Sequence, residues 1–497
     1  MTWQEDWLME NQGIGSWVQR RRIKSAAHAA IIFGEQVITY EALAARVDAL
    51  ASALRGEGVV VGDRVAYVGD NHPSFVETLF AVTALGAIFV PLNTRLAAAE
   101  LEYAIEDSGA SVLIRAQHFT VSGPRTITVG AELDALIAAA EPAVIDVAVA
   151  LDDPAVILYT SGTTGRPKGA VLSHGNLSWN SINVLVDYDL TSNDRALMIS
   201  PLFHAASLGM GTLPAFLKGA TVVLEASFDA ENTLAQIARH RITWISGVPT
   251  TYQLLCESPS WATTDLSSLR TITCGGSPVP LRVLDAWEAR GLSFTGGYGM
   301  TETAPGATSL QSDRSRDKAG SAGLPHFFTD VRIVDESGAD AAPGEVGELQ
   351  VRGPNVIAEY WNRPEDSAGA FAPGGWFRSG DLAYIDDESY VYISDRLKDM
   401  IISGGENIYP AEIEQAIMQL DEVTGVAVIG VPDHKWGEVP IAIVTSRGTV
   451  DSALVRAHLE PQFARYKIPK RVIVVDELPR TASGKVRKAD LRARFSL

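Results

Sequence analysis

Short apolar runs rich in β-branched residues recur along the first half of the chain, at 65–68, 111–114, 196–199, 221–224 and 244–248. Helical stretches separate many of these runs. Strands that alternate with helices tend to pair in parallel, because each helix carries the chain back across one face of the sheet. The pattern therefore predicts βα units and largely parallel sheets.

The pattern changes after Gly320. The runs 331–334, 347–351 and 390–393 alternate apolar and polar positions between turns rich in Gly, Pro and Asp. Strict alternation is typical of antiparallel strands with one buried face, so we expect a small antiparallel, barrel-like part here.

The last hundred residues form a further unit. Pro410 opens a stretch with apolar residues at helical spacing, namely Ile413, Ala416, Ile417 and Leu420. Strand-like runs follow at 426–429 and 441–444, then a helix from about Ser452 and another run at 471–475. This order predicts a compact α+β domain.

Composition narrows the function classes. The chain has 497 residues and a formal net charge of −19, which argues against nucleic-acid binding by bulk electrostatics. Cys256 and Cys274 suit neither a CxxC site nor a disulfide framework, so we expect a reduced, cytoplasmic compartment.

The sequence predicts no segment that crosses a membrane. Residues 1–6 are acidic where a signal peptide is basic. The longest apolar stretch, 79–92, is shorter than the ~20 residues of a spanning helix, and we expect a buried helix that runs into a strand. We predict at most peripheral membrane contact. A homodimer is one of the oligomeric states that the sequence allows.

Candidate chemistry begins at residues 159–174, which read YTSGTTGRPKGAVLSH and follow the apolar run 155–158. Glycines let backbone N–H groups crowd around an anion, hydroxyls add donors, and Lys168 adds a mobile positive charge. Gly169 follows Lys168, so this is not a Walker A loop. The stretch is typical of a strand that leads into a phosphate-binding loop.

That stretch resembles the phosphate-binding signature of the acyl-adenylate-forming superfamily, which includes acyl-CoA synthetases, adenylation domains and luciferases. Further segments resemble the other family motifs, in family order: 201–204 (PLFH), 275–278 (GGSP), 297–303 (GYGMTET), 376–381 (WFRSGD), 395–399 (DRLKD), 402–410 (ISGGENIYP) and 479–485 (PRTASGK). Two departures are Ser379, where Thr is commoner, and Asp395, where Gly usually precedes the Arg. The resemblance covers essentially the whole chain.

The resemblance implies an α/β fold with two unequal domains. A large N-terminal domain at 1–394 is expected to hold two mostly parallel, helix-flanked sheets, with the β-barrel-like part at about 320–394. A hinge at 395–398 leads to a small mobile α+β C-terminal domain at 399–497. The implied reaction joins an acid to ATP as acyl-AMP, with Mg²⁺ and release of pyrophosphate, and CoA then displaces AMP.

The same resemblance implies the phosphate and metal site. The β- and γ-phosphates are expected in the loop of Thr160, Ser161, Gly162, Thr163, Thr164, Gly165 and Lys168. Thr301 and Glu302 bring a hydroxyl and a carboxylate to the phosphate and Mg²⁺, with Glu302 as metal ligand.

The adenosine site is expected around Tyr298, whose face suits adenine, together with Gly275, Ser277, Pro278 and Gly299. Asp381 is expected to accept from both ribose hydroxyls, and Arg396 to reach ribose or phosphate. From the residues alone, alternatives stay open: Tyr298 as a core aromatic, Asp381 as a turn or cap acid, and Arg396 as an ion-pair partner of Asp395 or Asp399.

Two faces of the small domain are expected to alternate at the active site. Lys485 neutralises charge during adenylation, although by context alone it could be one more solvated cation. Rotation about Lys398 then exchanges it for Gly404, Gly405 and Glu406, where a Gly-Gly turn suits a pantetheine arm. His204 is expected where pantetheine meets the acyl pocket.

The acid is less sharply defined. The expected pocket wall is small or apolar: Ala205, Ala206, Leu208, Gly209, Val248, Gly275, Gly299 and Met300. It holds no Arg or Lys for a second carboxylate, which disfavours a dicarboxylic acid. A medium- or long-chain fatty acid is the first choice, and a bulky cyclic or aryl acid the alternative. An enzyme that loads a carrier protein is a further alternative, and a catalytically silent binding protein is the least favoured.

The hinge hypothesis predicts the behaviour of a Lys398→Pro variant. Proline fixes φ near roughly −65° and removes an N–H, so it should trap one orientation of the small domain. We expect acyl-AMP to form and accumulate while its conversion to acyl-CoA becomes slow, as measured by single-turnover assays of each half-reaction. Lys398→Ala is the control and should be much milder; normal turnover by the Pro variant would place the pivot elsewhere.

Overall fold

The computed structural model describes residues 9–160, 167–276, 279–396, 399–403, 406–434, 436–463, 465–481 and 485–495, and for 396, 406 and 407 the backbone alone. The predicted site residues Ser161, Gly162, Thr163, Thr164, Gly165, Ser277, Pro278, Lys398, Gly404 and Gly405 lie outside the described residues. Among the described residues, no helix is long and apolar enough to cross a membrane.

A six-stranded sheet forms from the first part of the chain, in the order β6-β5-β3-β4-β7-β8. Its strands are β3 (Arg64–Val68), β4 (Ile88–Pro91), β5 (Val112–Arg115), β6 (Arg125–Thr128), β7 (Pro154–Thr160) and β8 (Lys168–Ser173). All pairs are parallel except β7 with β8. The associated helices are α2 (Tyr40–Gly56), α3 (Pro73–Ala84), α4 (Ala98–Ser108) and α5 (Ala131–Ala139). The run 79–92 is the predicted buried helix, α3, leading to strand β4.

A nine-stranded sheet follows, in the order β15-β14-β13-β12-β11-β9-β10-β1-β2. Its strands are β1 (Ala29–Phe33), β2 (Gln36–Thr39), β9 (Arg195–Met198), β10 (Thr221–Leu224), β11 (Trp244–Gly247), β12 (Thr271–Gly275), β13 (Phe294–Gly299), β14 (Gly306–Leu310) and β15 (Leu324–Pro325). The six central strands pair in parallel, and the strands at both ends are antiparallel.

The helices of this part connect its strands. They are η2 (Ile14–Ser16), α1 (Trp17–Ser25), α6 (His174–Asp187), α7 (Ala205–Ser207), the π-helical turn η3 (Leu208–Thr212), α8 (Leu213–Lys218), α9 (Ala230–His240), α10 (Pro249–Glu257), α11 (Leu281–Glu288), η4 (Thr301–Thr303) and η5 (Ser312–Arg314). The largest core cluster includes Phe80 of α3 and Phe216 of α8, whose rings meet edge to face at 5.3 Å. These contacts join the helices of the two sheets into one body.

The region after Gly320 is antiparallel, as its alternating pattern predicts. The strands are β16 (Asp330–Val334), β17 (Gly347–Arg352), β18 (Phe371–Ala372), β19 (Trp376–Ile385) and β20 (Val391–Arg396), with helix α12 (Pro364–Gly369) before β18. The order β16-β17-β19-β18 is completed by β20, which pairs with β19.

The C-terminal unit has its own sheet, in the order β22-β21-β24-β23, with β25 parallel to β24. Its elements are β21 (Ile401–Ser403), β22 (Glu406–Ile408), α13 (Pro410–Ile417), β23 (Val423–Asp433), β24 (Gly437–Ser446), α14 (Ser452–Leu459), β25 (Val472–Val474) and α15 (Lys488–Phe495). The predicted runs 426–429 and 441–444 are direct partners, since Val426 pairs with Val444 and Ile429 with Ile441. One detail differs: α13 ends at Ile417, so Leu420 packs on the small core from the following turn.

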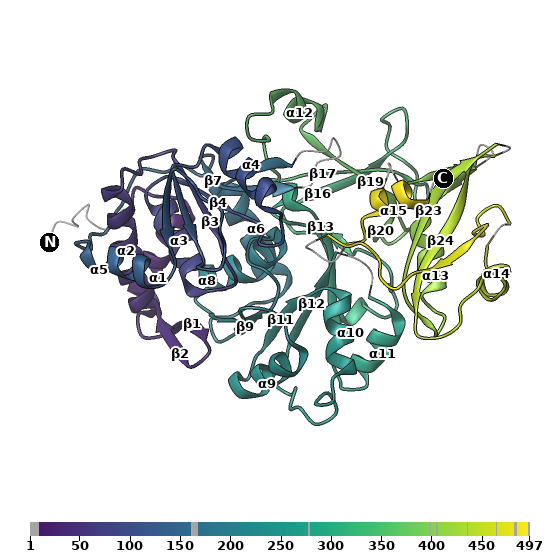
Figure 1. Cartoon of the computed structure of the whole chain (residues 1–497), viewed down its shortest axis with the longest axis horizontal. Coiled ribbons are helices and arrows are strands. Elements are labelled where there is room, and N and C mark those ends of the chain that lie inside the picture. The colour runs from purple at the N-terminus through teal and green to yellow at the C-terminus, as the bar shows by residue number, and fades with distance from the viewer. Residues whose placement is uncertain are drawn as a thin grey trace.

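Figure 1 shows how these parts are arranged. The N-terminal helices lie at one end of the long axis and the C-terminal unit at the other, next to the antiparallel strands β19 and β20. The observed α/β architecture, with large parallel sheets and a small C-terminal unit, confirms the predicted fold class. The boundaries 394, 395–398 and 399 of the two domains stay a prediction.

Candidate active site

Four parallel strands of the nine-stranded sheet end at the same edge. The pairing aligns Gly247 of β11 with Cys274 of β12, and Gly275 of β12 with Gly297 of β13. In open α/β sheets, ligands bind outside the carboxyl ends of the strands. The strand order therefore brings the 201–204 motif, residues 275–276 and the 297–303 motif to one edge.

Glycines leave room at this edge. A Cβ atom on Gly275 would have the Gly297 carbonyl oxygen as its nearest neighbour, 3.9 Å away. Gly276 has φ of +87°, a backbone conformation that side chains other than glycine rarely adopt. The loop that the resemblance assigns to adenine is thus open at Gly275 and depends on glycine at Gly276.

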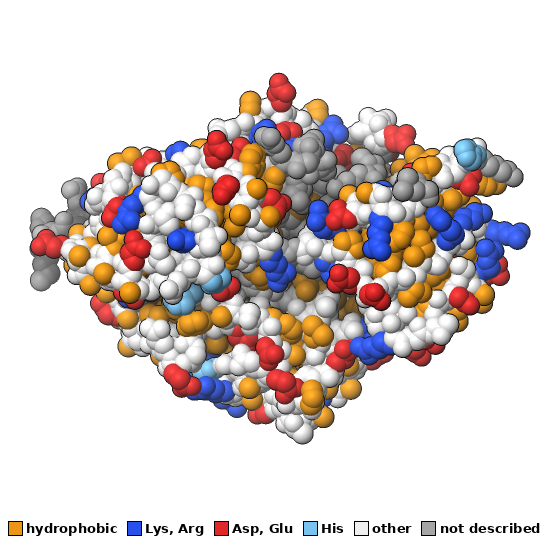
Figure 2. Space-filling model, in the orientation of Figure 1, with side chains coloured by type: hydrophobic (Ala, Val, Ile, Leu, Met, Phe, Trp, Pro, Cys, Tyr) orange, Lys and Arg blue, Asp and Glu red, His pale blue; other side chains and the backbone are white. Residues whose placement is uncertain are grey.

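Lys485 reaches this edge from the C-terminal unit. Its Cε lies 3.9 Å from the position that a Cβ on Gly276 would take, and Val248 Cγ1 lies 3.8 Å from the same point. The Lys485 backbone N–H donates to Thr481 Oγ1 at 3.1 Å. Figure 2 shows Lys and Arg side chains gathered over the C-terminal unit on this face. In this structure Lys485 thus lies at the edge where the resemblance implies that it acts during adenylation.

Tyr298 and Asp381 are held together. The Tyr298 hydroxyl donates to Asp381 Oδ2 at 2.6 Å, and the Asp381 side chain is buried. Ser379 Oγ accepts from the Asp381 N–H at 3.0 Å and donates to the Leu349 carbonyl at 2.5 Å, so Ser at this departure from the family pattern shapes the turn. A carboxylate has about four acceptor positions, so Asp381 can bind the phenol and still accept from ribose hydroxyls.

The predicted phosphate side is a chain of paired polar groups. Lys168 Nζ lies 2.6 Å from Asp366 Oδ1 and 5.6 Å from the centre of the Tyr360 ring. The Tyr360 hydroxyl donates to Glu302 Oε1 at 2.9 Å. Tyr360 thus contacts Lys168 through the face of its ring and Glu302 through its hydroxyl.

Tyr360 and Asp366 were not predicted. Neither lies in a glycine-rich or histidine-rich segment, so composition does not mark them. The available signal is Pro364, which starts helix α12 and puts Asp366 in its first turn.

Magnesium fits the donor set at Glu302. Mg²⁺ prefers oxygen ligands and is usually held by one or two carboxylates together with substrate phosphates. Among the described residues no group of three or more His, Cys, Asp or Glu residues could hold a metal ion by itself. Glu302 and the neighbouring Thr301 hydroxyl would therefore hold the ion together with phosphate oxygens, which neutralise its charge.

His204 lies at the start of the segment that follows strand β9. Its ring centre is 4.6 Å from that of Phe203, and its backbone N–H donates to the Pro201 carbonyl at 3.1 Å. In the expected acyl wall, Ala206 is exposed whereas Leu208 and Gly209 are buried. A Cβ on Gly209 would come within 2.4 Å of the Ala304 carbonyl oxygen. Gly209 therefore packs against the backbone behind the expected pocket wall.

Arg396 pairs with Asp381 through the backbone of strands β20 and β19. Its side chain, like that of Glu406, lies outside the described residues. The neighbouring Asp395 carboxylate accepts from the Ala411 N–H at 2.9 Å, in the first turn of α13. Lys488 Nζ lies 2.9 Å from Glu414 Oε1. Burial lowers the pKa of Lys488, but the negative charges of Glu414 and Asp395 have the larger combined effect, so the pKa is raised overall. These contacts tie the predicted hinge to the C-terminal unit.

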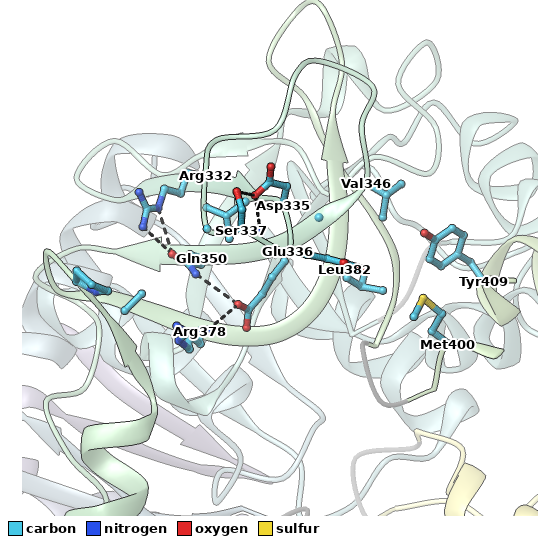
Figure 3. Close-up of a pocket in the computed structure, with 16 residues that line it drawn as sticks. Arg332, Asp335, Glu336, Ser337, Val346, Gln350, Arg378, Leu382, Met400 and Tyr409 are labelled. Atoms are coloured by element: carbon cyan, nitrogen blue, oxygen red, sulfur yellow. Dashed lines mark hydrogen bonds and ion pairs between the residues drawn. The ribbon is translucent and has the colours of Figure 1, made fainter. Parts of the chain in front are cut away.

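A separate cavity of about 630 Å³ lies between the antiparallel sheet and the start of the C-terminal unit (Figure 3). Arg332 donates to Gln350 Oε1 on its floor, and Arg378 pairs with Glu348 at 3.4 Å. Met400 and Tyr409 line the opposite side. None of its described lining residues is a named site residue, although Arg378 and Tyr409 belong to the 376–381 and 402–410 motif segments.

Comparison with known proteins identifies the family. Residues 18–361 match the AMP-binding enzyme family, and residues 412–485 match the AMP-binding enzyme C-terminal domain. The chain belongs to this family. The predicted resemblance to the acyl-adenylate-forming superfamily is confirmed.

The relatives are acid–CoA ligases of several kinds. Feruloyl-CoA synthases of Amycolatopsis sp and Streptomyces sp are each 50% identical over 495 residues, which cover 98% of this chain and 100% of theirs. The indoleacetate–CoA ligase of Aromatoleum aromaticum is 43% identical, with 96% of this chain and 97% of the relative covered. A long-chain-fatty-acid–CoA ligase of Mycobacterium tuberculosis is 38% identical, with 92% and 93% covered.

A solved structure supports the cofactors. The o-succinylbenzoate CoA synthetase of Bacillus subtilis, in complex with ATP and a magnesium ion, has a TM-score of 0.88 and 34% identity, with 96% of this chain and 99% of that chain covered. The chain is an AMP-forming acid–CoA ligase that uses ATP, Mg²⁺ and CoA. The roles of single residues stay predictions.

The position of Lys485 predicts an asymmetric effect of Lys485→Ala. Acyl-AMP formation from acid and ATP should fall by about 10²–10³-fold, because a donor aimed at developing charge is lost. Thioester formation from preformed acyl-AMP should be largely spared, because Lys485 acts in only one orientation. Arg487→Ala removes a nearby exposed cation and is the control. Equal losses in both half-reactions would contradict the assignment.

Proposed function

We propose that this enzyme activates an aryl-substituted carboxylic acid, of the hydroxycinnamic or arylacetic type, and converts it into its CoA thioester. The observation that carries the proposal is 50% identity over 98% of the chain to feruloyl-CoA synthases, followed by 43% to an indoleacetate–CoA ligase. Identity to the fatty-acid ligase is lower, at 38%. The first choice of a fatty acid is thus not confirmed, and the aryl alternative fits better.

The edge of the sheet supports a flat substrate. Gly275 leaves open space next to Gly297, and Val248 supplies an apolar side chain beside it. Glycine has no side chain, so a planar ring can lie against the backbone at Gly275, whereas a Cβ on Gly297 would come within 2.9 Å of the Thr308 carbonyl oxygen. The expected wall contains no cation, so an acid with one carboxylate and a neutral ring is favoured.

Different residues of the chain then have different tasks in the reaction. A carboxylate oxygen of the acid bonds to the α-phosphorus of ATP as the bond to pyrophosphate breaks, and Lys485 stabilises the negative charge there. Tyr298 and Asp381 hold the adenosine, and Glu302 would hold the magnesium. In the second step the CoA thiol releases its proton to solvent, its sulfur bonds to the acyl carbon, and the bond from that carbon to the AMP phosphate oxygen breaks.

An acid panel tests the substrate class. Ferulic, coumaric, indoleacetic, decanoic, palmitic and succinylbenzoic acids are compared by AMP release and acyl-CoA formation, with CoA or a carrier protein as acceptor. We expect kcat/KM for the best aryl acid to exceed that for decanoic acid by at least about tenfold. This ratio corresponds to about 1.4 kcal/mol of transition-state binding free energy, which a pocket shaped to fit an aromatic ring can supply. A higher value for either fatty acid would refute the aryl proposal. A carrier protein that outcompetes CoA would change the acceptor.

A further inference from the structure

Tyr360 lies between the two segments that the phosphate chemistry uses. Its hydroxyl donates to Glu302 Oε1 at 2.9 Å, and its ring lies under Lys168, whose Nζ is 5.6 Å from the ring centre. Lys168 begins strand β8, and Glu302 is in the short helix η4. One side chain therefore contacts both the predicted phosphate lysine and the predicted metal ligand.

The backbone fixes the tyrosine in this place. Tyr360 forms an antiparallel bridge with Ala170, next to which the Trp361 N–H donates to the Gly169 carbonyl at 2.7 Å. On the other side, the Ile357 N–H donates to the Glu302 carbonyl at 2.9 Å. The backbone of the segment 357–361 is thus anchored to β8 and to η4, which fixes the point from which the Tyr360 side chain extends.

Charge around the tyrosine is balanced. Asp366 pairs with Lys168 at 2.6 Å, and the Lys168 side chain is mostly buried at 16% exposure. The Tyr360 hydroxyl is a neutral donor to Glu302, so it holds the carboxylate without adding a charge.

The geometry points to Tyr360 as a positioning residue that orients the Glu302 carboxylate for the magnesium–phosphate complex and supports Lys168 through its ring face. A carboxylate with one oxygen held by a donor presents its other lone pairs in a fixed direction. Donors of this kind behind a metal ligand typically change metal affinity by about 10–100-fold when they are removed. The ring makes a separate contribution, because a cation over an aromatic face is stabilised without any hydroxyl.

The chain contains a matched control. The hydroxyl of Tyr40, a fully buried residue of helix α2, donates to the Ala220 carbonyl at 2.7 Å. Tyr40 belongs to none of the motif segments and is not part of the predicted metal site. Tyr40→Phe therefore removes one tyrosine hydroxyl and one hydrogen bond without touching Glu302 or Lys168.

The experiment measures binding without turnover. ATP affinity is determined by calorimetry with and without Mg²⁺, and no acid is present, for the wild-type enzyme, Tyr360→Phe, Tyr360→Leu and Tyr40→Phe. For Tyr360→Phe we expect the Mg²⁺-dependent gain in ATP affinity to fall about tenfold, with metal-free ATP affinity unchanged. Tyr360→Leu should also weaken metal-free ATP binding, because Lys168 loses the ring. Tyr40→Phe should change neither quantity.

Thermal unfolding separates this role from a structural one. Tyr360→Phe and Tyr40→Phe should have similar unfolding temperatures, because each loses one hydrogen bond of a tyrosine hydroxyl. If the Mg²⁺-dependent gain in ATP affinity is the same as in the wild-type enzyme for both variants, or is reduced equally in both, Tyr360 has only a structural role. Because no acid takes part, the outcome is independent of whether the substrate is aryl or aliphatic.

Discussion

The parallel pairing of β9, β11, β12 and β13 is the constraint on which the site depends. Each strand must end at the same edge, so segments that are far apart in the sequence are brought together there. The chain then reverses into β14, and Asn355 secures the reversal by donating to the carbonyls of Thr303 and Gly306, both at 2.7 Å. Because Asn355 is fully buried, these bonds are shielded from water and hold η4, with Glu302, next to the edge.

The predicted alternation of two faces of the C-terminal unit sets a second constraint, because this unit would have to contact the site firmly enough to act and weakly enough to leave. Its contacts with the large part include an exposed ion pair between Arg447 and Glu257 at 2.9 Å. Exposed pairs of this kind contribute about 0–1 kcal/mol, so breaking one costs little. Asp395 is different, because its buried carboxylate accepts from the first turn of α13. The contacts near the predicted hinge are therefore better shielded than those at the periphery.

The polar and apolar halves of the site follow different rules. On the phosphate side, Lys168, Asp366, Tyr360 and Glu302 pair with one another, which avoids an uncompensated buried charge. On the acyl side the residues are small or apolar, and shape decides what fits. This difference explains how relatives that share the AMP-binding family act on feruloyl, indoleacetyl and long-chain fatty acyl groups. The reaction can be inferred from the motifs, whereas the acid depends on the form of the pocket.

The sequence by itself determined the alternation of strands and helices, the antiparallel change after Gly320 and the chemical groups of the motifs, because these depend on local periodicity and residue type. It did not reveal that the Tyr298 hydroxyl holds Asp381, or that Tyr360 binds Glu302, since these partners are 83 and 58 residues apart. Nor could it show that Lys485 reaches Gly276. Only the tertiary structure decided these contacts, because which distant side chains meet depends on how strands order and domains dock, and no local pattern encodes that.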